Sequence, residues 1–195
     1  SYTFKKYMET EDSSWPLLLP MTKGAVKAMD VVQEFIKENY SNNVDDFVVT
    51  GASKRGWTTW LVSAVDQRVK GLAPMVYDNL DLPEQMKHQI EAWGEYSPQI
   101  KDYTENDFPD MVSGGQGKDL VEIVDPYCYR DEITQPKLIM IGTNDPYWPA
   151  DAINIYYDEL PGRKYIYYAA NHGHGLGNYD SLLRSLEAFI LSVRG

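Results

Sequence analysis

A serine, an aspartate and a histidine each follow a short apolar run, and their side chains suit nucleophilic catalysis. Ser53 stands in Val49–Gly56 (VTGASKRG), Asp145 in Ile141–Pro149 (IGTNDPYWP) and His174 in Asn171–Leu176 (NHGHGL). In such a set the serine attacks a carbonyl, the histidine takes the hydroxyl proton and the acid orients the imidazole. Ser, Asp, His is one of the chain orders in which this triad occurs. The sequence therefore predicts a serine hydrolase.

Ser53 lies between a predicted strand and a predicted helix, the setting of a nucleophile elbow. Gly51 lets the backbone pack closely there, and the helix N-terminus favours developing negative charge. The backbone N–H of Lys54 is placed to donate to the oxyanion. The usual spacing is Gly-x-Ser-x-Gly, but here Arg55 takes the place of the second glycine and Gly56 follows it. The alternative is a serine that only caps a helix.

The acid and the base each have an alternative interpretation. Asp145 suits the triad acid, which must be held rigidly after a strand. The alternative is that it only forms a turn, as aspartates before a proline often do. Asp151 is a second candidate for the acid. His174 has a glycine on either side, which exposes the ring. His172 and His174 could instead form a metal pair, but neither a cysteine nor a third ligand motif accompanies them. We predict neither a metal nor a cofactor.

The elements that must position these residues alternate between strand and helix. Continuous apolar strands between helices are typical of a parallel sheet covered on both faces, so the fold class is α/β with about four strands. Functional sites in such sheets lie beyond the carboxyl ends of the strands. The expected strands are Asp46–Thr50, Val69–Tyr77, Lys137–Gly142 and Lys164–Ala169; the expected helices are Thr22–Asn39, Arg55–Ala64, Pro83–Tyr96, Pro149–Leu160 and Tyr179–Val193.

The polar stretch from Asp78 to Glu132 interrupts this alternation. An insertion of this length between two strands predicts a lid, partly helical, that shapes access to the site. Trp57 follows the serine turn and Trp148 follows the acid loop, so both are expected near the mouth of the site with Arg55 as substrate contacts. The 195 residues are predicted to form one domain, 1–195, with the lid at about 78–132.

Composition excludes several classes of function. Eighteen Lys and Arg against 29 Asp and Glu give a net charge of −11, which repels phosphate backbones and argues against nucleic acid as a partner. Because no run approaches 18 apolar residues, we expect no membrane span. No charged and then apolar leader opens the chain. The lone Cys128 excludes an internal disulfide.

Long segments also resemble the PhoPQ-activated pathogenicity-related proteins, an α/β-hydrolase group of mainly secreted or periplasmic proteins with poorly defined substrates. The resemblance covers nearly the whole chain and includes the Ser-Lys-Arg-Gly elbow and an Asn-x-Gly-His-Gly pattern that selects His174 over His172. The elbow is also similar to that of glucuronoyl esterases, where a basic side chain after the serine aids the oxyanion hole, which implies such a role for Lys54 or Arg55. The resembling segments are Leu17–Asp30, Thr50–Trp57, Val76–Asp81, Gln85–Tyr96, Ile123–Arg130 and Gly142–Pro149.

Members of this family are much longer and have several strands before the helix at Thr22. The resemblance implies that the chain is the C-terminal portion of a hydrolase, whose first strand would form an exposed edge. A partner chain or a second copy is expected to cover that edge. The second oxyanion donor comes from a loop of the preceding half in such enzymes, so we expect weak or no activity from the chain alone.

The sequence thus predicts a Ser-His-Asp hydrolase of α/β-hydrolase type that acts on an ester or a peptide-like substrate. Ester chemistry is favoured by the elbow, and the substrate is expected to be a small molecule, a peptide or a glycan ester. Peptidase chemistry is the close second prediction, because prolyl-peptidase-like hydrolases share the Gly-Thr-x-Asp turn. The alternative from another class is a secreted binding or signalling protein that keeps the hydrolase scaffold without turnover.

Overall fold

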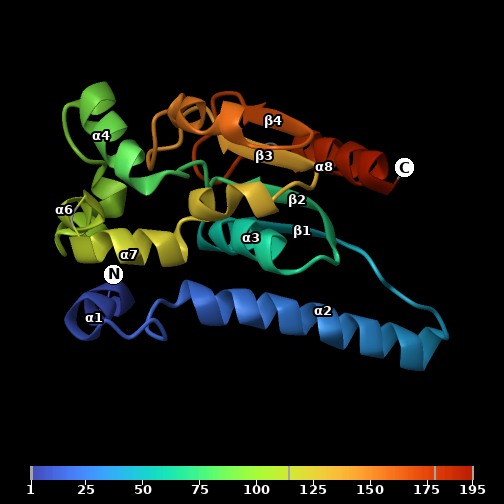
Figure 1. Ribbon diagram of the computed structural model, residues 1–195. Helices are drawn as coiled ribbons and strands as arrows, with labels where there is room; N and C mark the ends of the chain where they lie inside the picture. The colour runs from blue at the N-terminus through green and yellow to red at the C-terminus, as the bar shows by residue number, and fades with distance from the viewer. Residues whose placement is uncertain (1, 114, 178, 195) are drawn as a thin grey trace.

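The computed structural model describes residues 2–113, 115–177 and 179–194 (Figure 1). Helices and strands alternate through β1, α3 and β2, and again from β3 to α8. The strands are β1 (Phe47–Ala52), β2 (Val69–Met75), β3 (Lys137–Gly142) and β4 (Lys164–Ala169). The α-helices are α1 (Tyr2–Thr10), α2 (Leu18–Tyr40), α3 (Lys54–Val65), α4 (Leu82–Trp93), α5 (Lys101–Thr104), α6 (Phe108–Ser113), α7 (Gly115–Val124) and α8 (Tyr179–Arg194). Short 3₁₀ helices are η1 (Pro98–Ile100), η2 (Pro126–Glu132), η3 (Ala152–Ile155) and η4 (Tyr157–Glu159).

The four strands form one parallel sheet in the order β1-β2-β3-β4. Because all four run the same way, the loops that follow β1, β2, β3 and β4 leave from the same edge of the sheet. The order also leaves β1 at one side of the sheet and β4 at the other. The predicted α/β class, with about four parallel strands, is confirmed.

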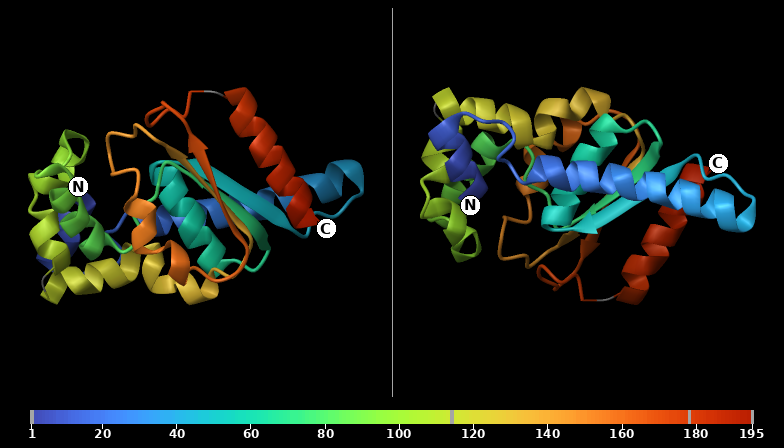
Figure 2. Two further views of the ribbon diagram at one scale, coloured as in Figure 1. Left: turned by 90° about the horizontal axis from the view of Figure 1, so that it is seen from above. Right: turned by 90° about the horizontal axis from the view of Figure 1, so that it is seen from below.

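Both faces of the central strands β2 and β3 are covered, which explains why β3 is apolar without alternation, whereas the outer strands β1 and β4 are only partly buried. Along β3, Leu138 and Met140 join the cluster beneath α8, whereas Ile139 and Ile141 join the larger cluster around α3. Figure 2 shows α3 and α8 on opposite sides of the sheet. Residues of one strand that point in opposite directions therefore stabilise two separate cores.

Helix α2 is long and packs beside the sheet rather than across it (Figures 1 and 2). Met29 of α2 is buried against Val62 of α3 and Val69 of β2. Arg68 ties the same elements together, since its guanidinium pairs with Asp66 at 2.6 Å and with Asp30 of α2 at 2.9 Å. These contacts, together with Leu18 of α2 in the larger cluster around α3, attach α2 to the rest of the fold.

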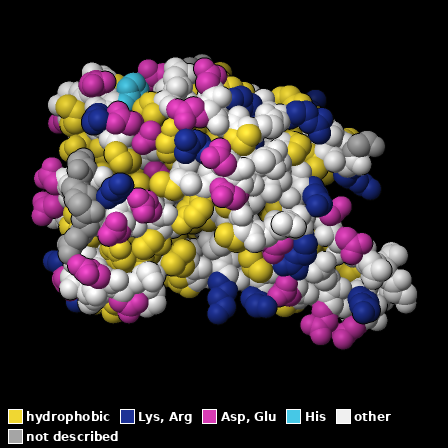
Figure 3. All heavy atoms as spheres, viewed as in Figure 1, with side chains coloured by type: hydrophobic (Ala, Val, Ile, Leu, Met, Phe, Trp, Pro, Cys, Tyr) yellow, Lys and Arg dark blue, Asp and Glu magenta, His cyan; other side chains and the backbone are white. Residues whose placement is uncertain are grey.

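The segment between β2 and β3 builds the end of the molecule opposite the C-terminus, where α4, α6 and α7 lie together with α1 (Figure 1). Phe4 of α1 stacks on Phe108 of α6, with ring centroids 5.6 Å apart. Acidic side chains are frequent over this end in Figure 3, and basic ones appear along the lower edge over α2. The predicted insertion, residues 78–132, is therefore a packed layer of helices, and the N-terminal helix α1 packs against it.

Two expectations for the elements need correction. Residues 149–160, predicted as one helix, form the separate 3₁₀ turns η3 and η4. Helix α2 begins at Leu18 instead of Thr22, so that Thr22 lies inside the helix and its hydroxyl donates to the Leu18 carbonyl. The bounds of β3 and β4 agree with the prediction. In the described part of the chain, none of the helices combines the length and the apolar character needed to cross a membrane.

Asp125 is a buried carboxylate that joins α4 to η2. It accepts from the backbone N–H of Leu82 at 2.7 Å, of Tyr127 at 2.9 Å and of Asp81 at 3.3 Å. These donors begin the two helices and have no acceptor within them. One side chain therefore fixes where α4 starts relative to the rest of the insertion.

We predict that Asp125→Ala lowers the free energy of unfolding by about 2 kcal/mol, because it leaves buried backbone donors without an acceptor. Asp125→Asn retains one acceptor oxygen and should lose less than half as much. Urea denaturation followed by circular dichroism measures both. An equal loss in the two variants would contradict this role for the carboxylate.

Candidate active site

Ser53 sits at the tight turn between β1 and α3 with a positive φ of 58° and a ψ of −123°. Residues with a side chain rarely adopt this conformation, which costs roughly 1–3 kcal/mol and clusters at functional sites. The Ser53 N–H donates to the Met75 carbonyl of β2 at 2.9 Å, which fixes the turn against the next strand. The turn predicted from the sequence therefore forms and holds Ser53 at the carboxyl edge of the sheet.

Two glycines allow α3 to approach the sheet this closely. A Cβ on Gly51 would lie 2.6 Å from the Arg55 carbonyl oxygen. A Cβ on Gly56 would lie 2.8 Å from the Met75 carbonyl oxygen and 2.9 Å from the Tyr77 Cβ. The close approach therefore falls at Gly56, one position beyond that of the usual Gly-x-Ser-x-Gly motif. This explains physically why Arg55 is tolerated where the second glycine is expected.

His174 and Asp145 form a hydrogen-bonded pair at the same edge. The Asp145 Oδ2 lies 2.8 Å from the His174 Nδ1, and its Oδ1 accepts from the Tyr147 N–H at 3.0 Å. The Asp145 side chain is 2% exposed and that of His174 is 27% exposed. The Tyr147 ring packs on the imidazole with centroids 4.2 Å apart. With Nδ1 engaged by the acid, Nε2 is the ring nitrogen left for proton transfer.

The loops that carry the acid and the histidine are held together by their backbones. The Asn144 N–H donates to the His172 carbonyl at 3.0 Å, and the Asn171 N–H donates to the Thr143 hydroxyl at 2.8 Å. A Cβ on Gly142 would overlap the carbonyls of His172 and Gly173. The glycine at the end of β3 is therefore required for the histidine loop to reach the acid loop.

Ser53 and His174 line one cavity of about 280 Å³. Among the described residues no hydrogen bond joins the two side chains, and the Ser53 hydroxyl has no acceptor. Hydrogen bonds of this kind are often long or poorly aligned without substrate. The structure thus brings the three predicted residues to one site and joins two of them.

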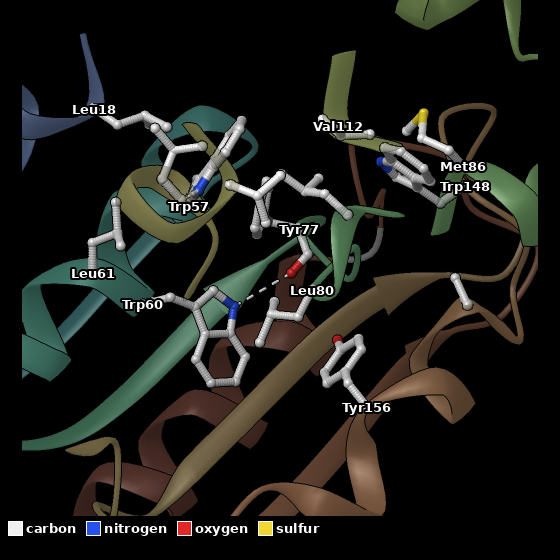
Figure 4. Packing of buried hydrophobic residues seen from close by; sticks show 14 of the residues in the cluster. Leu18, Trp57, Trp60, Leu61, Tyr77, Leu80, Met86, Val112, Trp148 and Tyr156 are labelled. Carbon is white, nitrogen blue, oxygen red and sulfur yellow. Dashed lines mark hydrogen bonds between the residues drawn. The ribbon is translucent and has the colours of Figure 1, made fainter. Parts of the chain in front are cut away.

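The predicted oxyanion donor Lys54 and the predicted substrate contacts also line this cavity; the contacts are Arg55, Trp57 and Trp148. Lys54 and Arg55 are exposed, and in the described part of the chain neither forms a salt bridge. Trp57 is 4% exposed; its Nε1 donates to the Val124 carbonyl and its ring stacks on Tyr77 at 4.9 Å (Figure 4). Trp148 is 8% exposed and stands beside Met86 of α4 (Figure 4). The two tryptophans are therefore largely buried walls of the cavity.

The sequence analysis overlooked the residues that follow β2. Val76 has a φ of 44°, unusual for a β-branched residue, and Tyr77, Asp78 and Asn79 come directly after it. Tyr77 and Asn79 line the cavity, whereas Asp78 is buried behind it with both carboxylate oxygens unpartnered. Burial and the neighbouring Asp145 raise the pKa of Asp78 to about 7. The signal was their place at the carboxyl end of a strand, the criterion that identified Ser53 and Asp145.

The alternative candidates lie elsewhere. Asp151, the second candidate acid, pairs with His88 of α4 at 2.9 Å. The His172 ring packs against Gly177, whereas the His174 ring faces Asp145. Across the residues that the structure describes, no three His, Cys, Asp or Glu side chains are grouped as metal ligands.

Comparisons with known proteins agree on the family and the fold. Residues 1–194 match the family described as PhoPQ-activated pathogenicity-related protein. The chain is 37% identical over 194 residues to Autocrine proliferation repressor protein A of Dictyostelium discoideum, which covers 97% of this chain and 39% of that protein. The chain therefore spans well under half of this relative's length.

Solved structures similar to this chain include two esterases and a further hydrolase. The acetyl xylan esterase from Paenibacillus sp. R4 has a TM-score of 0.65 at 18% identity, covering 91% of this chain and 54% of that one. Acetyl xylan esterase 1 from Thermoanaerobacterium sp. JW/SL YS485 has a TM-score of 0.57 at 17% identity, over 84% and 50% of the two chains. A puromycin hydrolase has a TM-score of 0.58 at 19% identity, over 80% and 23%. These similarities show the α/β-hydrolase fold.

We predict that Gly56→Ala lowers the free energy of unfolding by about 2 kcal/mol or more, because the new methyl group overlaps the backbone of β2. Gly24→Ala is the matched control. It lies inside α2 with no atom within 4 Å of the new Cβ, so it should gain about 0.5–1 kcal/mol from helix propensity. Urea denaturation measures both. A gain in stability from Gly56→Ala would refute the close approach.

Asp78 should make stability fall as pH rises. Its pKa of about 7 in the folded state lies above the model-peptide value of 3.8, so between pH 4 and 7 the folded state binds more protons than the unfolded state. The stabilisation that the protonated Asp78 provides is complete below pH 4 and is lost as the pH rises from 4 to 7. Asp125, whose burial also raises its pKa to about 7, acts in the same window.

We therefore predict that Asp78→Asn reduces the loss of stability between pH 4.5 and 7.5 by roughly 2–4 kcal/mol. The measurement is the urea midpoint at several pH values for the variant and the wild type. Parallel pH curves for the two proteins would contradict the burial of an unpartnered carboxyl at this position.

Proposed function

Because the chain belongs to the PhoPQ-activated pathogenicity-related family and has the α/β-hydrolase fold, we propose that it is a serine hydrolase with Ser53 as nucleophile, His174 as base and Asp145 as acid. The observation that carries the proposal is the hydrogen bond between His174 and the buried Asp145, in the wall of the cavity that Ser53 also lines. The positive φ of Ser53 supports it, since a serine that only caps a helix needs no such strain.

In the proposed reaction the Ser53 Oγ attacks the carbonyl carbon of an ester, and its proton passes to the His174 Nε2. Asp145 stabilises the imidazolium through the hydrogen bond to Nδ1. The imidazolium gives the proton to the departing alcohol, and water then repeats the sequence on the acyl-enzyme to release the acid. Ester substrates are favoured over peptides by the similarity of the elbow to that of glucuronoyl esterases. The names of the two similar esterases agree with this preference.

The oxyanion would be held by the Lys54 N–H, which lies at the start of α3 where the helix supplies no acceptor of its own. Arg55, Trp57 and Trp148 are proposed substrate contacts because they line the same cavity. A second donor comes from an earlier loop in α/β-hydrolases, and we propose that this loop and the cover for the β1 edge belong to a further segment or a partner chain. Secreted or periplasmic action is proposed from the family alone.

Residues 78–132 are proposed as the lid within a single domain. Side chains from this segment form much of the cavity wall, including Leu82 and Met86 of α4 and Phe108 of α6. The segment packs on α1 and is linked to η2 through Asp125. A lid of this kind determines the size of the group that reaches Ser53.

A second candidate function is a binding or signalling protein that retains the scaffold. The name of the Dictyostelium relative, a proliferation repressor, favours it. The absence of a hydrogen bond between Ser53 and His174 among the described residues also agrees with it. The two candidates differ in one property, the nucleophilicity of Ser53.

We predict that a fluorophosphonate probe labels the protein and that Ser53→Ala abolishes labelling. His174→Ala should slow labelling by at least about 10³-fold, because it removes the group proposed to take the hydroxyl proton. Mass spectrometry of the labelled peptide identifies the modified serine.

Ser41→Ala is the matched control, since Ser41 also has a positive φ, of 53°, but lies at the end of α2 away from the cavity. It should label like the wild type. The probe is applied to the protein together with the segment or partner that supplies the proposed second oxyanion donor; a folded wild-type protein that still resists the probe would reject the hydrolase and favour the binding protein.

A further inference from the structure

Asp78 is a buried acid beside the proposed triad, and the reaction described above does not use it. The residue is 1% exposed, and neither of its carboxylate oxygens has a hydrogen-bond partner in the described structure. Burying a carboxyl group without a partner costs free energy, so such a group in a native protein calls for an explanation. Features that cost stability in this way are expected at functional sites.

The backbone around Asp78 holds its carboxyl group inside the protein. The Val76 N–H donates to the Met140 carbonyl of β3 at 2.8 Å. The Tyr77 carbonyl accepts from the Trp60 Nε1 of α3 at 3.4 Å (Figure 4). The segment is therefore tied to β3 and to α3, and these contacts bury the Asp78 side chain although it has no partner of its own.

Asp78 also lies between the two loops that carry the nucleophile and the acid. Strand β2 pairs with β1 on one side and with β3 on the other, and Ser53 and Asp145 follow those two strands. Since the three strands are parallel, the segments that follow them meet at one edge of the sheet. The Ser53 N–H is bonded to the Met75 carbonyl at the end of β2, three residues before Asp78. The fold thus places this third acidic loop position between the other two.

The titratable side chains that act on the Asp78 carboxyl group come from the triad and from the β4 side of the sheet. Asp145 and His174 belong to the proposed triad, Tyr156 lies between η3 and η4, and Tyr168 lies in β4. Burial raises the pKa of both tyrosines, which therefore stay neutral near pH 7. Asp145 opposes a charge on Asp78, whereas His174 and the backbone N–H of Asp78 itself favour it.

The favourable interaction with His174 grows during the proposed reaction. The attack of Ser53 moves a proton to His174, which then carries a positive charge. A second anion near this charge stabilises it, and the effect is larger in apolar surroundings than in water. The carboxylate that destabilises the resting protein is therefore favourable once the proton has moved.

We propose that Asp78 is a positioning residue of the hydrolase, a second acid that acts on His174 together with Asp145 and stabilises the imidazolium formed when Ser53 attacks. This inference rests on the proposed function. Asp78 makes no contact with the substrate and acts only through the histidine. Because only the ionised carboxyl group has this effect, the effect is expected above pH 7, where Asp78 has lost its proton.

The test compares the wild type with Asp78→Asn, which keeps the shape of the side chain but cannot ionise. The rate of fluorophosphonate labelling of Ser53 is measured from pH 5.5 to 8.5, with the proposed source of the second oxyanion donor present. At pH 5.5 Asp78 is mostly protonated, so the two proteins should label at similar rates. At pH 8.5 the wild type should label at least about threefold faster, because only its residue 78 is charged. The ratio of the two rates removes the effect of pH on the probe.

Asp125→Asn is the matched control. Asp125 is also fully buried, and burial raises its pKa to about 7. The groups that act on it belong to the lid, namely Asp81, Leu82 and Tyr127. Asp125→Asn should therefore give the same ratio to the wild-type rate at every pH. Circular dichroism at each pH checks that all three proteins are folded.

A second measurement does not require labelling. The His174 ring is followed by nuclear magnetic resonance after ¹³C labelling of the histidines, and His174→Gln assigns its signal. The signals of the wild type and of Asp78→Asn should coincide at pH 5.5 and separate by pH 8.5, because a charge appears beside the ring only in the wild type. The signals of the wild type and of Asp125→Asn should coincide at both pH values.

A ratio of labelling rates that stays constant from pH 5.5 to 8.5 overturns the proposal, since a merely structural role of Asp78 would change the rate alike at every pH. A pH-dependent ratio for Asp125→Asn overturns it as well. If the wild type does not label, the proposed hydrolase fails and the resonance signals decide whether Asp78 acts on His174. Signals that separate at pH 8.5 keep that interaction, and signals that coincide reject it.

Discussion

The close approach of α3 to the sheet is the constraint on which the site depends. Gly51 and Gly56 remove the side chains that would hold the helix away, and Ser53 then takes a positive φ with its N–H bonded to the Met75 carbonyl of β2. The same contact puts the Lys54 N–H at the helix start and brings Trp57 against Tyr77. The strain at Ser53 is balanced by a helix and two strands that pack well only when the turn is tight.

A second close contact completes the arrangement at the other strands. Gly142 lets the carbonyls of His172 and Gly173 approach the end of β3, and that approach puts the His174 ring onto the Asp145 carboxylate. Behind this pair, Asp78 is buried without a partner, which costs stability above its pKa of about 7. The carboxyl edge of the sheet therefore combines backbone strain, unpaired polar atoms and a buried acid, features that a protein selected only for stability would lack.

The sequence predicted the parallel sheet well because its strands carry unbroken apolar runs. Lys137–Gly142 and Lys164–Ala169 were located to the residue, since Pro136 and Gly162 lie close to their starts and polar loops follow them. The prediction was wrong at residues 149–160, where an apolar pattern with helical spacing forms two 3₁₀ turns. Periodicity reports which side chains are buried, and it does not distinguish a continuous helix from short turns buried on the same side.

The sequence by itself determined the order of the strands and helices and the turn that carries Ser53, because those depend on local spacing and on glycines at fixed distances. It also named Asp145 and His174, since each follows a strand whose direction the parallel sheet fixes. The family pattern also selected His174 over His172, and only the tertiary structure decided that the His174 ring reaches the Asp145 carboxylate and that Asp78 is buried with both carboxylate oxygens unpartnered. Those facts depend on which groups lack a partner after packing, and no local pattern of residues records that, because the partners come from segments far apart in the chain.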